Sequence, residues 1–294
     1  MMDLSTVQHG IFEDVPQYGR FLFFQLRHEA TDDEVKHCLQ ALTAHVDGLS
    51  AVLGLGDATL SAFNAQHLEP LHFPSYDTRG VQVPSTPAAL WLWLRGDDLA
   101  IITLAAQAFI SELKPVYQFD SAIDAFKYKD GRDLTGYEDG TENPEGDDAF
   151  EAAFSEQPAG GSYVAVQKWQ HDLAHFKSKT QDEQDHTFGR RLSDNKELGD
   201  APQSAHVKRT EQEGFDPETF LLRRSMAYTE GVEAGLVFQS FSYTPDSFTK
   251  MMAKMVGEED GIVDGLFSFT RPLTGAFFWC PPMKDGQPDL SFIL

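Results

Sequence analysis

The sequence is poor in cysteine and in positive charge, and it has no long apolar run. Its 2 cysteines, Cys38 and Cys280, are too few for a disulfide framework and are typical of a reducing compartment. The 23 Lys and Arg are outnumbered by 46 Asp and Glu, so the formal net charge of -23 excludes nucleic acid and anionic membranes as expected partners. No apolar stretch approaches the length of a membrane-spanning helix.

Signals for export and for common cofactors are also missing. Residues 1–20 lack a basic segment followed by an apolar one, and they contain no twin arginine, so we expect a cytoplasmic protein without a leader. Gly54-Leu55-Gly56 is too short for a dinucleotide fingerprint. No phosphate loop or nucleophile elbow occurs.

The most distinctive stretch of the chain is residues 136–144, GYEDGTENP. Two glycines enclose Glu138 and Asp139, and Asn-Pro closes the run. Because glycine adopts backbone conformations that other residues avoid and Asn-Pro favours a turn, the pattern predicts a tight turn that holds a carboxylate in a fixed place. The spacing leaves open whether that carboxylate is Glu138, Asp139 or Glu142.

The first half of the chain reads as strands alternating with helices. Thr31 and Glu34 form a capping box that starts one helix, and Asp97-Asp98 start another that ends near Leu113. Cys38 lies on the apolar stripe of the first helix, which favours a buried structural thiol over a catalytic one. Residues 64–90 are expected to be a long loop. The expected strands are 20–27, 49–55, 90–96 and 115–128.

The second half repeats this order of elements. We expect a polar helix over 172–188, a loop over 189–214, and a helix that begins at Thr244-Pro245 with an apolar stripe from Phe248 to Val256. The expected strands are 162–169, 220–228, 235–243, 266–271 and 276–280. Each half therefore reads β-α-β-β-α-β, which predicts an α+β fold of two ferredoxin-like modules.

Two side-chain arrangements could carry chemistry. Alternate residues of a strand share a face, so Arg223 lies on the same side as Ser225, and a buried arginine there would need an anion, a ligand or a carboxylate. The spacing leaves equally open that Arg223 faces solvent. His171 and His175 have the spacing of the HExxH zinc helix, but Asp172 replaces its glutamate, which favours a solvated helix face over a zinc hydrolase.

A series of segments resembles the dye-decolorizing (DyP-type) peroxidase family. Residues 136–140 match its GxxDG signature, and the missing leader is similar to its cytoplasmic bacterial branch. The further matching segments occur in the family's order and cover nearly the whole chain: SYVAVQKWQHDL, GRRLSDNKEL, SAHVKR, LLRRS, GLVFQSF and GIVDGLFSFTRPLTGAFF.

This resemblance implies an architecture and a cofactor. The two ferredoxin-like modules are expected to pack their antiparallel sheets together as in a dimeric α+β barrel, with one haem b per chain in the C-terminal module. We expect residues 1–144 to form the N-terminal module, which ends in the GxxDG turn, and residues 145–294 to form the haem-binding module.

The resemblance also assigns residues to the two sides of the haem. On the proximal side, His206 resembles the iron ligand and Asp264 its hydrogen-bonding acid, which would make the imidazole a stronger donor. Arg190 is expected to face a haem propionate, and Arg191 could substitute for it.

On the distal side, the resemblance makes Asp139 the acid/base and Arg223 the distal arginine. Ser225 stands where many relatives have asparagine, and its hydroxyl could still bind a distal water. Leu236 and Phe238 share one strand face and are expected to form walls of the distal pocket.

The implied activity is reduction of hydrogen peroxide to water through a ferryl haem, with dyes, phenolics or other one-electron donors as reducing substrates. An aspartate is a weaker base than histidine at neutral pH, so activity is expected to peak at acidic pH. A haem-binding or haem-handling protein with incidental peroxidase activity is the alternative. The resemblance also implies a homo-oligomer, and an encapsulin shell as partner has no support from the short C-terminal segment PDLSFIL.

Overall fold

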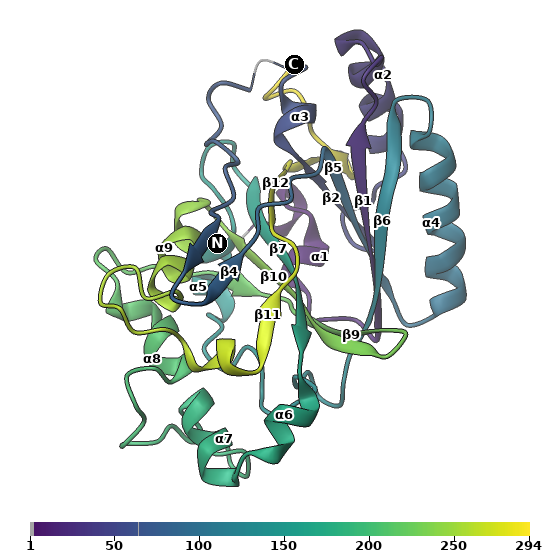
Figure 1. The fold of residues 1–294 in the computed structure, drawn as a ribbon. Helices are drawn as coiled ribbons and strands as arrows, with labels where there is room; N and C mark the ends of the chain where they lie inside the picture. Colours follow the sequence, from purple (N-terminus) through teal and green to yellow (C-terminus); the bar gives the residue numbers. More distant parts are fainter. Residues whose placement is uncertain (1–2, 64) are drawn as a thin grey trace.

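The computed structural model describes residues 3–63 and 65–294 (Figure 1). Its strands are β1 (Tyr18–Leu26), β2 (Ala51–Leu55), β3 (Tyr76–Thr78), β4 (Val81–Val83), β5 (Leu90–Gly96), β6 (Tyr117–Phe126), β7 (Ser162–His171), β8 (Leu222–Arg223), β9 (Met226–Glu230), β10 (Glu233–Ser242), β11 (Thr270–Pro272), β12 (Ala276–Cys280), β13 (Met283–Lys284) and β14 (Gln287–Pro288). Its α-helices are α1 (His9–Phe12), α2 (Asp32–Thr43), α3 (Asp57–Leu60), α4 (Leu99–Leu113), α5 (Gly146–Ala153), α6 (Leu173–Ser178), α7 (Gln181–Phe188), α8 (His206–Thr210) and α9 (Asp246–Met255). Short 3-10 turns occur at Leu4–Thr6, Gln212–Gly214 and Gly265–Ser268.

One antiparallel ten-stranded sheet closes on itself. Its order is β11-β7-β12-β2-β5-β1-β6-β9-β10-β8, and a further pairing between β7 and β10 completes a ring. In the first half, β1 lies between β5 and β6, and β2 lies beyond β5. In the second half, β7 lies between β10 and β12, and β9 lies beyond β10. Both halves therefore have the ferredoxin-like strand order. The predicted α+β fold of two ferredoxin-like modules with joined sheets is therefore confirmed. The division between residues 144 and 145 stays a prediction.

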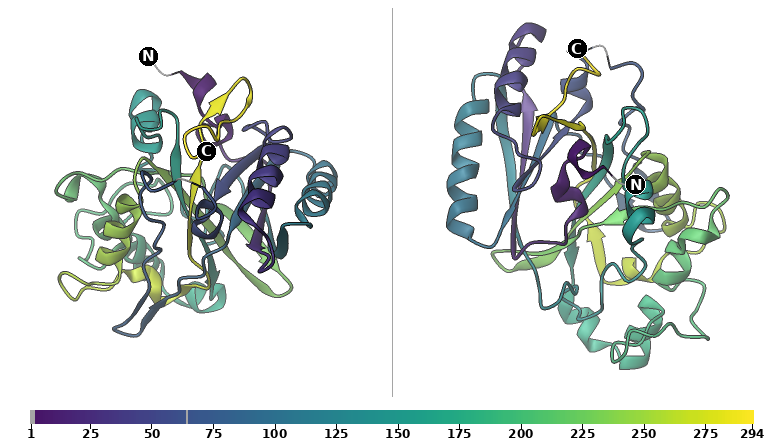
Figure 2. Two further views of the ribbon diagram at one scale, coloured as in Figure 1. Left: turned by 90° about the horizontal axis from the view of Figure 1, so that it is seen from above. Right: turned by 180° about the vertical axis from the view of Figure 1, so that it is seen from behind.

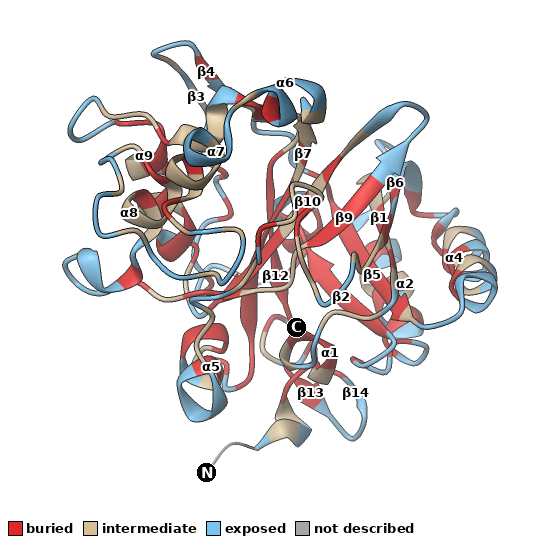
Figure 3. Ribbon diagram, turned by 90° about the horizontal axis from the view of Figure 1, so that it is seen from below, coloured by how far each residue is buried: buried red, intermediate tan, exposed pale blue. Residues whose placement is uncertain are grey.

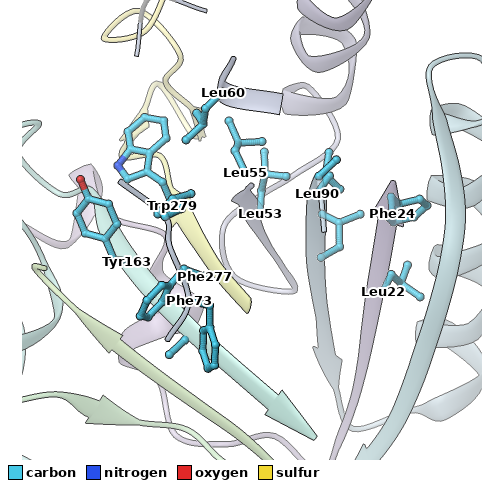
Figure 4. Packing of buried hydrophobic residues seen from close by; sticks show 14 of the residues in the cluster. Leu22, Phe24, Leu53, Leu55, Leu60, Phe73, Leu90, Tyr163, Phe277 and Trp279 are labelled. Carbon is cyan, nitrogen blue, oxygen red and sulfur yellow. The ribbon is translucent and has the colours of Figure 1, made fainter. Parts of the chain in front are cut away.

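Successive side chains of each strand point to opposite faces of the sheet, so an apolar layer lies on each face. One layer fills the inside of the ring with large aromatic rings, among them Phe21, Trp91, Trp93 and Phe278, and Figure 3 shows these strands as buried. The neighbouring residues point to the other face. There they form the second layer, which includes Leu22, Phe24, Leu53, Leu90 and Phe277 (Figure 4).

Helices cover this second layer on both sides of the ring. Helices α2 and α4 lie against the first half, and α9 lies against the second half with α8 packed on it (Figure 2). The predicted capping box is present, because Thr31 accepts from the backbone of Glu34 while Glu34 accepts from Thr31. Asp98 caps α4, as predicted. The apolar stripe of α9, from Phe248 to Met255, is buried.

Several local predictions are wrong. The loop over 64–90 contains the hairpin β3–β4, and the expected helix over 172–188 is two helices, α6 and α7, with α7 restarted by a capping box at Thr180 and Glu183. The loop over 189–214 contains α8. Pro245 is the N-cap of α9 and not its first helical residue. The strand over 266–271 is shortened, because a 3-10 turn occupies Gly265–Ser268.

Candidate active site

A main cavity opens between the outer face of the sheet's second half and the helices beside it. It has a volume of about 870 Å³, part of which is open to solvent. Its walls come from β7, β8, β10, α8, α9 and the turn after β6. Five of the predicted site residues line it: Asp139, His206, Arg223, Leu236 and Phe238.

His206 enters this cavity from the first turn of α8. Its Nδ1 lies 2.7 Å from Oδ2 of Asp264, whose side chain is fully buried. The other oxygen of Asp264 accepts from the backbone of Leu266 at 2.8 Å, which fixes the carboxylate. The remaining ring nitrogen of His206, Nε2, has no hydrogen-bond partner among the described residues. It is therefore available as a ligand atom.

The turn over residues 136–144 places its three acidic side chains in different environments. Gly136 and Gly140 have φ angles of 100° and 81°, a region that other residues rarely adopt. Glu138 accepts from Arg132 and from Asn195, each at 2.6 Å, and Glu142 pairs with Arg190. Asp139 has no hydrogen-bond partner within the described part of the chain, and it lines the cavity.

Tyr137 anchors this turn to α7. Its ring stacks on Phe188 with centroids 4.0 Å apart, and its hydroxyl donates to Asp185. Burial, together with this bond to a carboxylate, raises the pKa of Tyr137 well above its ordinary value. The tyrosine therefore remains a neutral donor that holds the turn in place.

Asn143 joins the turn to the strand that carries Arg223. The backbone N–H of Arg223 donates to Oδ1 of Asn143 at 2.9 Å, and Nδ2 of Asn143 donates back to the carbonyl of Arg223 at 3.0 Å. This reciprocal pair brings Asp139 and Arg223 to the same cavity. Over the described residues, the guanidinium of Arg223 forms no ion pair, so it is available to an anion.

The other predicted residues lie in three places. Leu236 and Phe238 form a wall of the main cavity on β10. Ser225 lines a separate polar hollow that also touches Asp139 and Arg223, and its buried Oγ has no hydrogen-bond partner among the described residues.

Arg190 borders a smaller hollow, also lined by His206 and Arg223, and pairs there with Glu142. Arg191 is exposed and pairs with Asp194 at 3.0 Å.

Comparison with known proteins identifies the family. The family model "Dyp-type peroxidase, C-terminal" matches residues 130–285. A dye-decolorizing peroxidase of Rhodococcus erythropolis is 32% identical over 257 residues, which are 82% of this chain and 75% of the relative. The chain belongs to the Dyp-type peroxidase family.

Solved structures of this peroxidase family share the fold. A putative Dyp-type peroxidase from Shewanella oneidensis aligns with a TM-score of 0.82 and 28% identity, covering 99% of this chain and 98% of that one. A variant of DypB from Rhodococcus jostii RHA1 in complex with haem aligns with a TM-score of 0.80 and 27% identity, covering 91% and 93%.

The main cavity also contains a buried pair that sequence reasoning missed. Nε2 of His171 lies 2.8 Å from Oδ2 of Asp133, and its Nδ1 lies 2.6 Å from the hydroxyl of Thr270. Burial alone would raise the pKa of Asp133, but the bonds from His171 and Thr135 outweigh it, so the pKa lies below its ordinary value. The only signal in the sequence was an aspartate close before the turn, and no spacing rule pairs it with His171.

This pair also corrects the zinc alternative. His171 is the last residue of β7 whereas His175 lies in α6, so the two rings do not share a helix face. Both nitrogens of His171 are already bonded. Among residues 3–63 and 65–294, no group of three or more His, Cys, Asp or Glu could hold a metal ion.

The four tryptophans differ in position. Trp91, Trp93 and Trp279 are fully buried in the core. Trp169 lines the main cavity and donates from its indole to Gln167 at 3.1 Å.

Proposed function

We propose that the main cavity holds one haem b, that His206 would bind its iron, and that Asp139 and Arg223 act on hydrogen peroxide in the same cavity. The protein is a peroxidase by its family, and haem is the cofactor with which a relative of the same fold is found. The observation that carries the residue assignment is the single cavity lined by His206, Asp139 and Arg223.

The residues of the cavity fit a haem. The free Nε2 of His206 would hold the iron, and the buried carboxylate on Nδ1 would fix the tautomer. Leu236, Phe238 and the methionines of α9 supply the apolar walls that a porphyrin face requires. Arg190, in the adjoining hollow, would reach a propionate after exchanging its bond with Glu142. When bound, the haem supplies the iron that accepts peroxide and stores its oxidising equivalents.

Asp139 and Arg223 would have different roles in the reaction with hydrogen peroxide. The carboxylate of Asp139 would take the proton from the near oxygen and return it to the far oxygen, which leaves as water. Arg223 would stabilise the negative charge that develops while the O–O bond breaks, because its guanidinium is free of ion pairs. Ser225 lies beside them in the polar hollow, where its unpaired hydroxyl can bind a water.

Turnover separates this function from that of a haem-handling protein. The purified haem-loaded protein should consume hydrogen peroxide in proportion to oxidation of a phenolic donor such as guaiacol, with two donors oxidised per peroxide. A protein that only binds haem would give no saturable dependence on the donor. Asp139→Asn should remove this turnover while the protein keeps its haem.

Location and assembly are further parts of the proposal. No helix within the described residues is long and apolar enough to cross a membrane. We place the protein in the cytoplasm on the strength of its resemblance and its free thiols. The outer side of α4 supports a homo-oligomer, because Ile101 and Leu104 are 67% and 72% exposed there. Light scattering combined with size-exclusion chromatography would test this assembly.

A further inference from the structure

A second hollow, here called the outer pocket, lies at the surface beside the main cavity. It has a volume of about 1100 Å³ and is open to solvent. The end of β7, the start of α6, the hairpin between β9 and β10, and β11 surround it (Figure 1). Its wall includes Gln170, Asp172, Val232, Phe267 and Arg271.

Only one layer of side chains separates the outer pocket from the main cavity. His171, Phe269 and Thr270 line both spaces. Trp169 lines the main cavity, and its ring centroid lies 5.4 Å from that of Phe267 in the outer pocket. A molecule in the outer pocket would therefore be one side chain away from the cofactor cavity.

The lining of the outer pocket combines apolar surface with positive charge. Phe267, Leu173 and Val232 offer apolar contacts. Nε and Nη2 of Arg271 donate only to the neutral Oε1 of Gln170, at 3.2 and 2.8 Å. Among the described residues, this arginine forms no ion pair with a carboxylate, although the chain carries twice as many acids as bases.

Other charged groups face the same space. Nζ of Lys179 donates to the hydroxyl of Ser268 at 2.6 Å, at the rim of the outer pocket. Asp172 is the opposing charge, but one of its oxygens accepts from the backbone of His175 at 2.8 Å. The carboxylate of Asp133 is bonded to His171 within the wall and does not line the outer pocket. Arg271 lines the outer pocket without a carboxylate partner among the described residues, and Asp172 is partly engaged, so the lining favours an anion.

We propose that the outer pocket binds the reducing substrate, and that this substrate is a small phenolic acid. Arg271 would hold its carboxylate, and Phe267 would contact its ring. This inference rests on the proposed peroxidase function, and it adds the place and the chemical class of the donor.

The electron balance is simple. Each phenol loses one electron through the shared wall to the oxidised cofactor, its O–H bond breaks, and the proton leaves to water. Two phenols thus return the two electrons that one hydrogen peroxide removed, and the products are two phenoxyl radicals and two waters.

Equilibrium binding to the haem-loaded protein without peroxide tests the site. Isothermal titration calorimetry would compare 4-hydroxybenzoate with its neutral analogue 4-hydroxybenzyl alcohol. Arg271→Gln should raise the Kd of the benzoate by about tenfold and leave that of the alcohol within about twofold, because only the benzoate loses a charge-assisted bond. Ala234→Phe, which fills the outer pocket, should weaken both. Lys284→Gln, an exposed and distant cation, is the matched control and should change neither.

The outcomes separate the two proposals. If Arg271→Gln and Ala234→Phe leave the Kd of the benzoate unchanged, the outer pocket is not the donor site. The same conclusion follows if Arg223→Gln weakens benzoate binding and Arg271→Gln does not, since the donor would then enter the main cavity. If binding changes as expected but the protein gives no peroxide turnover, the proposed peroxidase mechanism fails while the site stands.

Discussion

Nδ1 of His206 lies 2.7 Å from Oδ2 of Asp264, and this contact sets the chemistry of the site. A fully buried carboxylate holds one ring nitrogen, so only the other can serve as the proposed ligand in the cavity. The carboxylate accepts from the backbone N–H of Leu266, and the backbone N–H of Asp264 donates to the carbonyl of Met255 in α9. Two separate segments of the second half thus fix His206, the proposed iron ligand.

Loss of the negative charge at Asp264 should weaken the cofactor site. Asp264→Asn makes the imidazole of His206 a poorer donor, so we expect haem affinity to fall by about 10–100-fold and the reduction potential of the iron to rise. Haem transfer to apomyoglobin and a spectroelectrochemical titration would measure both. Asp285→Asn, an exposed remote change, serves as the control. An unchanged potential would contradict the role of Asp264.

Asp139 should control the reaction with peroxide without controlling haem content. Asp139→Asn removes the only acid of the turn that has no partner, so the second-order rate constant with peroxide should fall by about 10²–10⁴-fold. Stopped-flow absorbance would measure it. Glu138→Gln removes an equal charge one residue away, from a carboxylate already engaged by Arg132 and Asn195, and should cost far less. Equal losses in both variants would refute a specific role for Asp139.

Arg223 should act through its charge and its planar geometry. Arg223→Gln should slow peroxide cleavage by about 10²–10³-fold, and Arg223→Lys should recover only part of the rate, since an ammonium lacks the paired donors of a guanidinium. The backbone bonds of Arg223 to Asn143 survive both changes, so the fold should persist. Full activity of Arg223→Gln would remove it from the mechanism.

The pair of Asp133 and His171 should make the free energy of unfolding depend on pH in the acidic range. The pKa of Asp133 is lowered in the folded protein. Its contribution to folding stability is therefore fully present at pH values above the ordinary aspartate pKa of about 3.9, and it is lost as the pH falls through the pKa of the folded state. Asp133→Asn should cost about 3–5 kcal/mol at pH 7, as breaking a buried pair does. Urea unfolding of both proteins between neutral and acid pH should show this difference shrinking. A difference that stays constant would contradict the assignment.

Gly189 should be intolerant of any side chain. It ends α7 with φ of 85°, and an added Cβ would lie 2.3 Å from Cγ1 of Val207, next to the proposed ligand. Gly189→Ala should therefore displace α8 and lower haem content, measured by the pyridine haemochrome assay. Gly199→Ala, where an added Cβ meets nothing, is the control.

Strand and helix patterns predicted the fold well because they depend on local sequence. The capping box at Thr31, the Asp98 cap and the alternating strand over 162–169 each appear where expected. The break between α6 and α7 was missed, since a polar segment gives little helical periodicity and the second cap at Thr180 lies inside it. The zinc alternative failed for a related reason, because β7 extends to His171.

Long-range contacts within the site could not be read from spacing. Asp133 and His171 are 38 residues apart and meet only because the turn folds over the end of β7. The choice of Asp139 among three acids came from the family motif. The ion pairs of Glu138 and Glu142, which leave Asp139 unpaired, support the same choice on independent physical grounds.

The absorbance spectrum of the purified protein tests the central claim most directly. We predict a strong Soret band that shifts when hydrogen peroxide is added and returns when a phenolic donor follows. His206→Ala should lose the band or change it greatly. A wild-type protein reconstituted with haem that shows no Soret shift with peroxide, or a His206→Ala variant with full haem content and an identical spectrum, would contradict the account.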